Sequence, residues 1–289
     1  MGVVGAGRVG AVLGSALRAA GHAVVGASAV SEASRERAEL LLPGVPVLEV
    51  PEVVRRAELV LLTVPDDALP GLVGGLAELG AWQAGQLVVH TSGRHGWRVL
   101  APATASGAIP LALHPVMTFT GRSLDLARLV DCSFAVTAPT PVLPIGQALV
   151  VEMGAEPVVV AEEDRPLYHA ALAHGANHLV TLVAEAVDLL AAARVEQPAR
   201  VLGPLLSAAL DNALRQGDGA LTGPVARGDA GTVAAHVEAV ASSGVEGALA
   251  TYRRLARDTA DRALASGRLR PETAQALLAA LADDTVPPG

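Results

Sequence analysis

The sequence of 289 residues contains no lysine, because all 21 of its basic residues are arginine. This absence excludes a Schiff-base lysine and a lysine general acid. The single cysteine, Cys132, excludes a disulfide framework and a metal cluster held by thiolates. Aromatic residues are scarce, with two each of Phe, Tyr and Trp, and this number does little for or against an aromatic substrate.

Long uninterrupted apolar runs are also missing. Gly, Pro, Arg or Asp interrupts each one, so we expect no membrane span. No charged segment precedes an apolar run at the N-terminus, so we expect no signal peptide. The net charge of −8 argues against a nucleic-acid surface. These features favour a cytoplasmic protein whose partner is a small molecule.

The first ten residues carry the strongest motif. Residues 1–4 have the pattern of a short buried strand, and an amphipathic helix is expected at 8–20. The glycines between them form G-x-G-x-x-G, which in a dinucleotide site allows a tight turn, close approach to a pyrophosphate and close packing of helix on strand. The helix N-terminus offers N–H groups to the phosphates. The alternative is a plain loop in a glycine-rich chain. We predict cofactor binding by the whole loop: Gly5, Ala6, Gly7, Arg8, Val9 and Gly10.

The end of the second expected strand, at 22–27, bears on the choice between NAD and NADP. An Asp or Glu about 20 residues after the glycines would bind the ribose of NAD. Here Ser28 occupies that place, and Ser31, Arg35 and Arg37 follow. Hydroxyl and guanidinium groups suit a 2′-phosphate, so we predict NADP, with NAD as the less favoured cofactor. Alternatively, the arginines are solvated helix residues.

Strand and helix patterns alternate through residue 160. This alternation predicts an α/β Rossmann domain with a doubly wound, mostly parallel sheet. Further strands are expected at 58–64, 86–90, 109–113, 133–136 and 156–160. After residue 161 the strands stop and long Ala- and Leu-rich helices follow, at 165–193, 198–216, 230–242, 245–266 and 271–281. We predict a dinucleotide-binding domain at 1–160 and an all-α substrate and dimerisation domain at 161–289, and we expect residues 283–289 to fray.

Candidate ligand-binding residues follow these strands, because ligands bind at the carboxyl ends of strands in open α/β sheets. Val64 and Pro65 follow one strand and are expected to line the cofactor site. His114 is the best candidate for a general acid or base, because imidazole titrates near neutrality. Ser92, at a neighbouring strand end, is a second catalytic candidate and also a cofactor contact. The alternatives are a structural histidine and a plain turn serine.

The expected helical domain supplies further polar candidates. His174, Asn177 and His178 are spaced i, i+3 and i+4, so they share one helix face. We expect His174 and Asn177 to assist catalysis and His178 to contact substrate, although all three suit a domain or subunit interface equally well. Arg227 is a candidate for binding a substrate carboxylate, or it pairs with Asp229 or caps a helix. No carboxylate completes a zinc pattern between the two histidines, so we predict no metal site.

The chain resembles the Rossmann-like oxidoreductases that carry a C-terminal domain of unknown function, DUF2520. The motifs that carry this resemblance are the glycine loop, His90-Thr-Ser-Gly93, Leu113-His-Pro-Val-Met-Thr-Phe119, the helix from His169 to Asn177, and Leu221-Thr-Gly-Pro-Val-Ala-Arg-Gly-Asp229. The family is similar to pyrroline-5-carboxylate reductases, ketopantoate reductases and 6-phosphogluconate-dehydrogenase-type enzymes. The resemblance implies a helical domain of the 6-phosphogluconate-dehydrogenase type and makes 2-dehydropantoate a candidate substrate. The catalytic lysine of usual ketopantoate reductases has no counterpart here, where His174 stands three residues before Asn177. A local similarity of His114-Pro115 to the His-Pro of prephenate dehydrogenases supports His114 and Ser92.

These observations lead to one principal prediction and two alternatives. The principal prediction is an NADP-dependent oxidoreductase that reduces a small 2-oxo acid or an imine, with His114 supplying the proton. One alternative is a non-catalytic NADP-binding or sensing protein, which the missing lysine supports. The other is a prephenate- or arogenate-type dehydrogenase. We also expect a homodimer formed by the helical domain, because its Ala-rich helices are apolar on more than one face.

Overall fold

A computed structural model describes residues 1–282, so residues 283–289, for which fraying is expected, lie outside it. Its contacts divide the chain into two compact units, Met1–Ala173 and His174–Gly289. The sequence predicts a boundary after residue 160, where the expected strands end. In the structure helix α8 (Arg165–Leu172) still belongs to the first unit.

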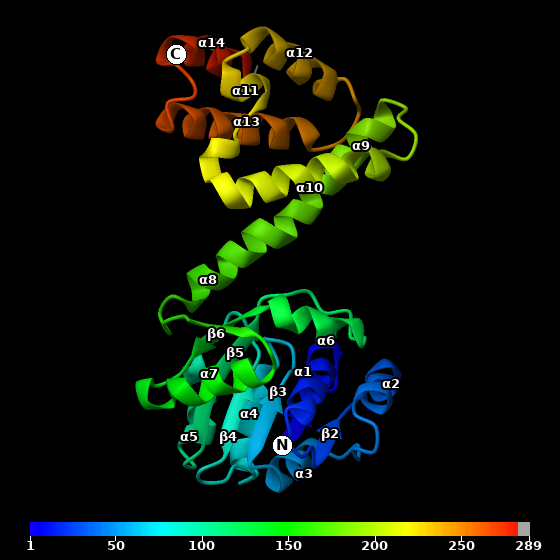
Figure 1. The fold of residues 1–289 in the computed structure, drawn as a ribbon, viewed down its shortest axis with the longest axis vertical. Coiled ribbons are helices and arrows are strands. Elements are labelled where there is room, and N and C mark those ends of the chain that lie inside the picture. Colours follow the sequence, from blue (N-terminus) through cyan, green and yellow to red (C-terminus); the bar gives the residue numbers. More distant parts are fainter. Residues whose placement is uncertain (283–289) are drawn as a thin grey trace. The chain divides into compact units, whose positions relative to one another are not determined.

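A seven-stranded sheet forms the centre of the first unit, in the order β2-β1-β3-β4-β5-β6-β7 (Figure 1). Its first five strands in this order are parallel, and β6 is antiparallel to β5. The carboxyl ends of these five strands therefore lie along one edge of the sheet. The strands are β1 (Gly2–Val4), β2 (Gly26–Ser28), β3 (Leu59–Leu62), β4 (Leu87–His90), β5 (Ile109–Pro115), β6 (Ser133–Thr137) and β7 (Glu156–Val159).

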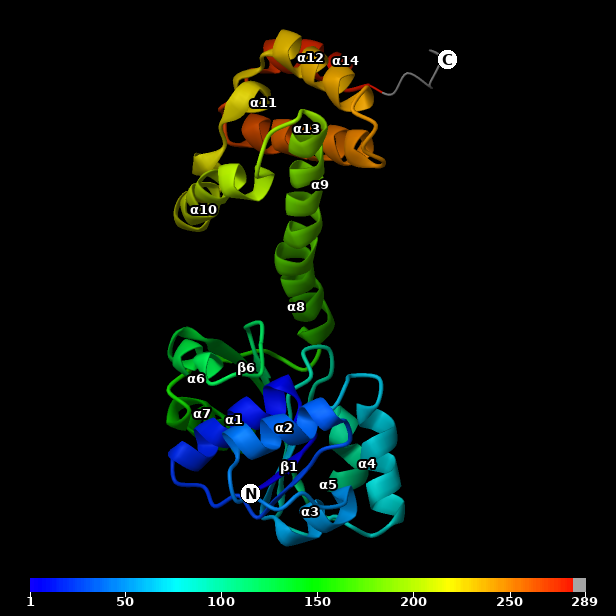
Figure 2. The ribbon, with the colours of Figure 1, turned by 90° about the vertical axis from the view of Figure 1, so that its right-hand side faces the viewer.

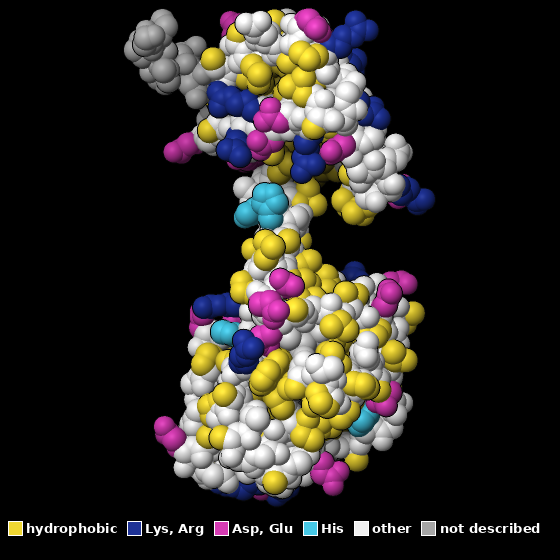
Figure 3. Space-filling model, turned by 90° about the vertical axis from the view of Figure 1, so that its left-hand side faces the viewer, with side chains coloured by type: hydrophobic (Ala, Val, Ile, Leu, Met, Phe, Trp, Pro, Cys, Tyr) yellow, Lys and Arg dark blue, Asp and Glu magenta, His cyan; other side chains and the backbone are white. Residues whose placement is uncertain are grey.

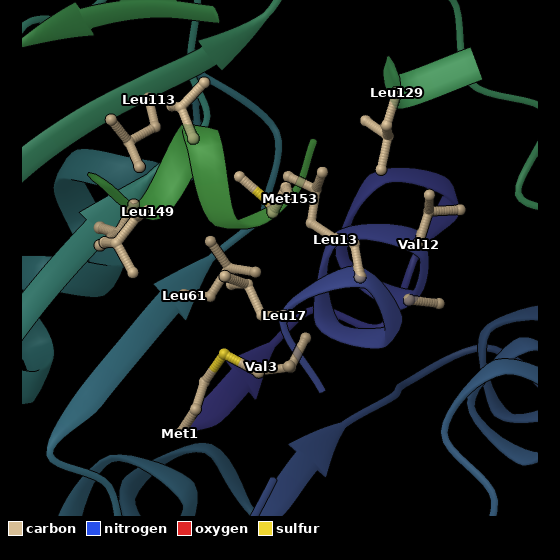
Figure 4. Close-up of a cluster of buried hydrophobic side chains, with 14 of the residues drawn as sticks. Met1, Val3, Val12, Leu13, Leu17, Leu61, Leu113, Leu129, Leu149 and Met153 are labelled. Atoms are coloured by element: carbon tan, nitrogen blue, oxygen red, sulfur yellow. The ribbon is translucent and has the colours of Figure 1, made fainter. Parts of the chain in front are cut away.

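Helices cover both faces of this sheet and enclose two apolar cores (Figure 2). One face is covered by α1 (Arg8–Ala19), α2 (Glu32–Leu41), α6 (Leu124–Arg128) and α7 (Leu143–Glu152). The other is covered by α3 (Val50–Arg56), α4 (Leu69–Glu78) and α5 (Ala101–Thr104). Figure 4 shows Leu13 and Leu17 of α1 and Leu149 of α7 around the strand residues Val3 and Leu61. This packing fixes α1, and with it the glycine loop, against the sheet.

Two strands differ from those expected. β2 starts at Gly26 rather than at residue 22, because β1 is only three residues long and its Gly2 already pairs with Gly26. β5 continues through Pro115 rather than ending at residue 113, because β6 pairs with it along its last four residues. His114 thus lies within the strand, opposite Ala135, instead of following it.

The second unit is helical, as expected. Ala226, Val233, Ala260 and Leu277 are among the side chains of its buried core. A π-helical turn, Ala173–Asn177, joins α8 to the first long helix. The helices are α9 (His178–Ala192), α10 (Pro198–Gln216), α11 (Gly223–Arg227), α12 (Ala230–Ala241), α13 (Ala248–Ala265) and α14 (Pro271–Ala280).

Apolar side chains are exposed on this unit, where Figure 3 shows yellow patches at the surface. No residue of α9 or α10 is buried within the described chain, and Leu205 and Leu214 are 66% and 80% exposed. The helical run Arg165–Ala192 is long and apolar enough to cross a membrane by length and composition alone. The run nevertheless contains Glu185 and Asp188, which are costly inside a bilayer.

Candidate functional site

The glycine loop has the geometry that a dinucleotide site requires. Gly5 has a φ of +91°, and a Cβ there would lie 2.9 Å from the Thr63 carbonyl oxygen. A Cβ at Gly10 would lie 2.2 Å from both the Gly5 carbonyl oxygen and Thr63 Oγ1, so this glycine allows α1 to approach the loop. At Gly7 the nearest atom would be 4.0 Å away, and no side chain caps the N-terminus of α1 there. The space at Gly7 and the N–H groups of the first turn of α1, which no side chain caps, fit a pyrophosphate.

The residues around the loop hold it in shape. The Thr63 hydroxyl donates to the Gly5 carbonyl oxygen at 2.6 Å, and Ser28 Oγ accepts the Gly5 N–H at 2.9 Å. Ser28 is only 6% exposed, so its clearest role is to support the loop. Val64, which follows β3, lies beside Gly5, where a Cβ would be 3.4 Å from its Cγ1. Pro65 accepts the N–H of Ala68 in the turn that leads to α4.

Arg37 rather than Arg35 lies against the elements near the loop. A Cβ on Gly121 would lie 2.9 Å from Arg37 Nε and 3.1 Å from Arg8 Cγ, so both side chains converge on this glycine. Arg35 is exposed on α2. Within the described residues neither Arg8 nor Arg37 forms an ion pair. Two guanidinium groups without a carboxylate partner suit an anion such as a 2′-phosphate.

Ser31 and Asp125 shape the surroundings of these arginines. Ser31 Oγ accepts the Ser34 N–H at 3.2 Å and caps α2, so this hydroxyl already serves the helix. Asp125 is buried and accepts the N–H groups of Thr120 and Gly121, at 2.7 and 2.8 Å. These hydrogen bonds hold the pKa of Asp125 below its usual value despite burial. The ionised carboxylate therefore keeps the loop with Gly121 in place beside Arg8 and Arg37.

Ser92 lies in a loop whose backbone is held by buried side chains. His90 Nδ1 accepts the Ser92 N–H at 3.2 Å, so its other nitrogen, Nε2, carries the proton and donates to the Gly96 carbonyl oxygen at 2.9 Å. Burial lowers the pKa of His90 to about 3, so the ring is neutral. Ser92 Oγ accepts the His95 N–H at 3.1 Å, which uses one of its lone pairs and leaves its own proton free to donate.

Glu162 and Arg165, two residues that the sequence analysis did not select, complete this loop. Glu162 accepts the N–H groups of Trp97 and Arg98 at 2.8 and 3.2 Å. Arg165 is fully buried, and it donates to the carbonyl oxygens of Ser92 at 2.7 Å and His95 at 3.0 Å. The segment that leads into α8 thus fixes the loop that follows β4. The one signal of this contact is the burial of Arg165 at the start of an apolar helix, and burial cannot be seen in the sequence.

His114 lies next to this loop with a partner that the sequence analysis also missed. Its Nδ1 is 2.7 Å from the hydroxyl oxygen of Tyr168, a hydrogen bond between β5 and α8. Burial, and then the Arg165 and His169 charges, lower the pKa of His114 to about 4. Burial raises the pKa of Tyr168 to about 12. Both groups are therefore neutral near pH 7, and one proton lies between them.

Gly93 allows this pair of side chains to come close to the loop. A Cβ on Gly93 would lie 2.6 Å from His169 Cδ2 and 2.8 Å from His114 Nε2. That nitrogen makes no hydrogen bond within the described residues, and it is not among their buried polar atoms without a partner. It therefore remains accessible to a ligand. The structure thus places His114 beside Gly93, the residue that follows Ser92, at the carboxyl end of β4.

The other predicted residues belong to the second unit. His174 and His178 are exposed, and their Nδ1 atoms are 3.0 Å apart, so one ring donates to the other. Both line a hollow between α9 and α13, whereas Asn177 lies in the π-helical turn and is exposed. Arg227 is exposed at the end of α11. Within residues 1–282, no group of three or more His, Cys, Asp or Glu side chains could hold a metal ion.

Asp229, considered above as a partner of Arg227, has a local role. It caps α12, where its carboxylate accepts the Thr232 N–H at 3.0 Å and the Thr232 hydroxyl at 2.7 Å. These two hydrogen bonds are the main reason that the pKa of Asp229 is lowered. Arg227 keeps its donors for another acceptor, because no ion pair joins it to Asp229 in the described part of the chain.

Comparison with known families confirms the resemblance stated above. Residues 1–115 match a Rossmann-like domain, and residues 132–259 match the domain of unknown function DUF2520. The DUF2520 match includes β6, α7 and β7, so it begins earlier than the helical domain expected at 161. A search of curated proteins finds no match.

Solved structures share this fold over most of the chain. A Bacteroides fragilis protein provisionally named an NADP oxidoreductase is 22% identical, with a TM-score of 0.70 over 89% of this chain and 96% of that one. A Streptomyces aurantiacus imine reductase is 20% identical, with a TM-score of 0.63 over 96% and 98%. A reductive aminase from Aspergillus terreus, in complex with NADPH and ethyl levulinate, is 16% identical, with a TM-score of 0.63 over 95% and 96%. The fold expected from the sequence is therefore confirmed.

Proposed function

We infer that this chain, in which a Rossmann-like domain is joined to a DUF2520 region, is an NADP-dependent reductase of a small 2-oxo acid or an imine. The observation that carries this proposal is the His114 imidazole, hydrogen-bonded to Tyr168 and open at Nε2, beside the edge that carries the glycine loop. Bound at that loop, NADPH would supply the hydride. The protein must then orient the substrate and provide a proton, and Ser92 and His114 are placed to do so.

The NADP preference rests on Arg37 and Arg8. We expect R37A to raise the KM for NADPH by about tenfold while leaving that for NADH nearly unchanged, because a charge-assisted hydrogen bond is worth about 1.5–3 kcal/mol. R35A should have a smaller effect, because Arg35 points to solvent. R55A, an arginine of α3 remote from the loop, removes the same charge as a control. Equal effects of all three variants on NADPH would contradict the assignment.

The substrate class is tested by measuring NADPH oxidation. We propose a panel of small 2-oxo acids, beginning with 2-dehydropantoate, and of cyclic and acyclic imines, with NADH compared in parallel. The solved structures of the same fold include an imine reductase and a reductive aminase, which makes the imines as important as the oxo acids. Turnover of one member with NADPH supports the proposal. Tight NADPH binding without oxidation across the panel would favour the sensing protein instead.

We further propose a homodimer in the cytoplasm. Exposed apolar side chains on α9 and α10 indicate an interface with another protein surface. A second copy of the chain is the simplest partner, because most soluble oligomers consist of identical subunits. Asn177, His174 and His178 lie at the start of this surface, which leaves an interface role open beside the catalytic one. The buried free thiol of Cys132 suits a reducing compartment. Light scattering should give twice the chain mass of 29.1 kDa, and a monomer mass would contradict this proposal.

A further inference from the structure

We propose that Tyr168 supplies, through His114, the proton that reduction of the substrate consumes, and that the buried Arg165 guanidinium stabilises the phenolate left behind. This inference rests on the proposed function and concerns how its proton is delivered. His114 is the catalytic residue, because its open Nε2 faces the ligand. Tyr168 and Arg165 act through it.

The first support is the geometry of the pair. The Tyr168 hydroxyl is 2.7 Å from His114 Nδ1, and the two rings meet edge to face with centroids 5.7 Å apart. The hydroxyl thus occupies the nitrogen that faces away from the ligand. On the opposite side of the imidazole, Gly93 leaves space beside Nε2, because a Cβ at that position would lie 2.8 Å from the nitrogen. A proton can therefore enter the ring at Nδ1 while another leaves at Nε2.

The second support is the charge around the pair. The charged and titratable groups that face His114 are Arg165 and His169 of α8 and Asp66 of the loop after β3. Arg165 is fully buried, its guanidinium carbon is 5.7 Å from the centre of the Tyr168 ring, and its Nη1 is buried without a hydrogen-bond partner. Its hydrogen bonds reach carbonyl oxygens rather than a carboxylate. The carboxylates of Glu162 and Asp66 act on this charge, but neither forms an ion pair with Arg165 in the described part of the chain. A phenolate at Tyr168 would lie closer and would be stabilised by the guanidinium.

The third support is that a neutral histidine needs a second donor. With a pKa of about 4, His114 is uncharged near neutrality, so loss of its Nε2 proton alone would leave an imidazolate. In the relay the substrate carbon accepts hydride, and the substrate oxygen or nitrogen accepts the Nε2 proton. The Tyr168 O–H bond breaks and an N–H bond forms at Nδ1, so the ring stays neutral throughout. The phenolate then regains a proton from solvent after product leaves.

The resting state of the relay is tested by nitrogen-15 NMR of the histidine rings in the full chain at pH 7, assigned with the variant H114Q. We expect His114 to carry its proton on Nε2, with Nδ1 unprotonated and accepting from Tyr168. A ring protonated on Nδ1 would overturn the proposal, because Tyr168 would then be the acceptor. This measurement needs no substrate, so it decides the relay even if no compound of the panel is reduced, a result that would contradict only the proposed function.

The working state is tested by Y168F. We expect kcat to fall about a hundredfold, at the low end of general acid catalysis, with NADPH affinity unchanged. The rate of the wild type should be level between about pH 6 and 9, whereas that of Y168F should fall about tenfold per pH unit, because only the imidazolium can then give up a proton and its fraction drops as pH rises above the pKa. A structural role would not create this slope.

The chain offers a matched control. The hydroxyl of Tyr252, the other tyrosine, lies 3.0 Å from Nδ1 of His236 in the second unit, so Y252F removes the same group from the same kind of pair. Y252F should retain the level pH profile. A Y168F enzyme with the wild-type profile would overturn the relay, whatever its kcat.

Discussion

Replacing His114 with alanine should reduce kcat about a thousandfold, within the range expected for loss of a general acid, while NADPH still binds. Its imidazole is the ring whose Nε2 is accessible beside Gly93, and within residues 1–282 no other side chain is hydrogen-bonded to the Tyr168 hydroxyl. The glycine loop lies beyond β3 and β4 in the sheet, so the cofactor site should remain intact. Steady-state kinetics with the best compound of the panel and a fluorescence titration with NADPH measure the two quantities separately.

The matched variant for this experiment is H236A. His236 also pairs with a tyrosine hydroxyl, but it belongs to the second unit. Its loss should leave kcat within about twofold of the wild type, since an exposed hydrogen bond contributes little. If H114A kept the full kcat, the assigned role of His114 would be wrong. A loss of NADPH binding in H114A would instead indicate that β5 supports the cofactor site.

Replacing Gly7 with alanine should weaken NADPH binding at least about tenfold, while the free protein loses no more than about 1 kcal/mol of stability. Apart from its chain neighbours, the added methyl group would meet no atom closer than 4.0 Å, so the expected loss of stability is only that of alanine in place of glycine at a helix N-cap. It would occupy the space in which we place the pyrophosphate, and it would hinder access to the N–H groups of α1. Calorimetric titration with NADPH and thermal unfolding of the free protein check both parts.

Gly74 provides the control, because it is a glycine of α4 with no atom within 4 Å of an added Cβ. Alanine is favoured over glycine inside a helix, so G74A should leave cofactor affinity unchanged and slightly raise the stability. The variant G10A differs from both, because its Cβ would clash with Gly5 and Thr63 and should destabilise the loop itself. NADPH affinity of G7A equal to that of G74A would exclude the phosphate role of Gly7.

The sequence predicts the elements of this site that depend on local patterns. The glycine loop, the strand ends and the candidates His114 and Ser92 follow from short motifs and from the rule that parallel strands end at one edge. For Ser28 the sequence predicts a cofactor contact but not a role in supporting the glycine loop. That role depends on its hydroxyl accepting the Gly5 N–H, 23 residues away in the sequence. Such a partner becomes visible only when the strands are paired.

The part of the site that the sequence does not predict consists of contacts between segments that lie far apart along the chain. Tyr168 is 54 residues from His114, and Arg165 is 73 residues from Ser92. Before folding, Tyr168 and Arg165 are ordinary members of an amphipathic helix. Their role arises from burial against the loop after β4, which no spacing rule predicts. The same holds for Arg37, which differs from Arg35 only in the direction its side chain takes from α2.

The hydrogen bonds from Glu162 and Arg165 to the loop after β4 have a consequence for folding during synthesis. Both residues lie near the end of the first unit, whereas the glycine loop and its supports lie within the first 65 residues. During synthesis the nucleotide site can therefore assemble well before the ribosome has delivered the residues that fix Ser92 and place Tyr168 beside His114. Bringing Arg165 to the loop after β4 closes a chain segment of 73 residues, which carries an entropy cost. The contacts made by Arg165 and Glu162 offset this cost once both residues have been synthesised. A nascent chain would thus be able to hold the nucleotide before it can carry out any chemistry with it.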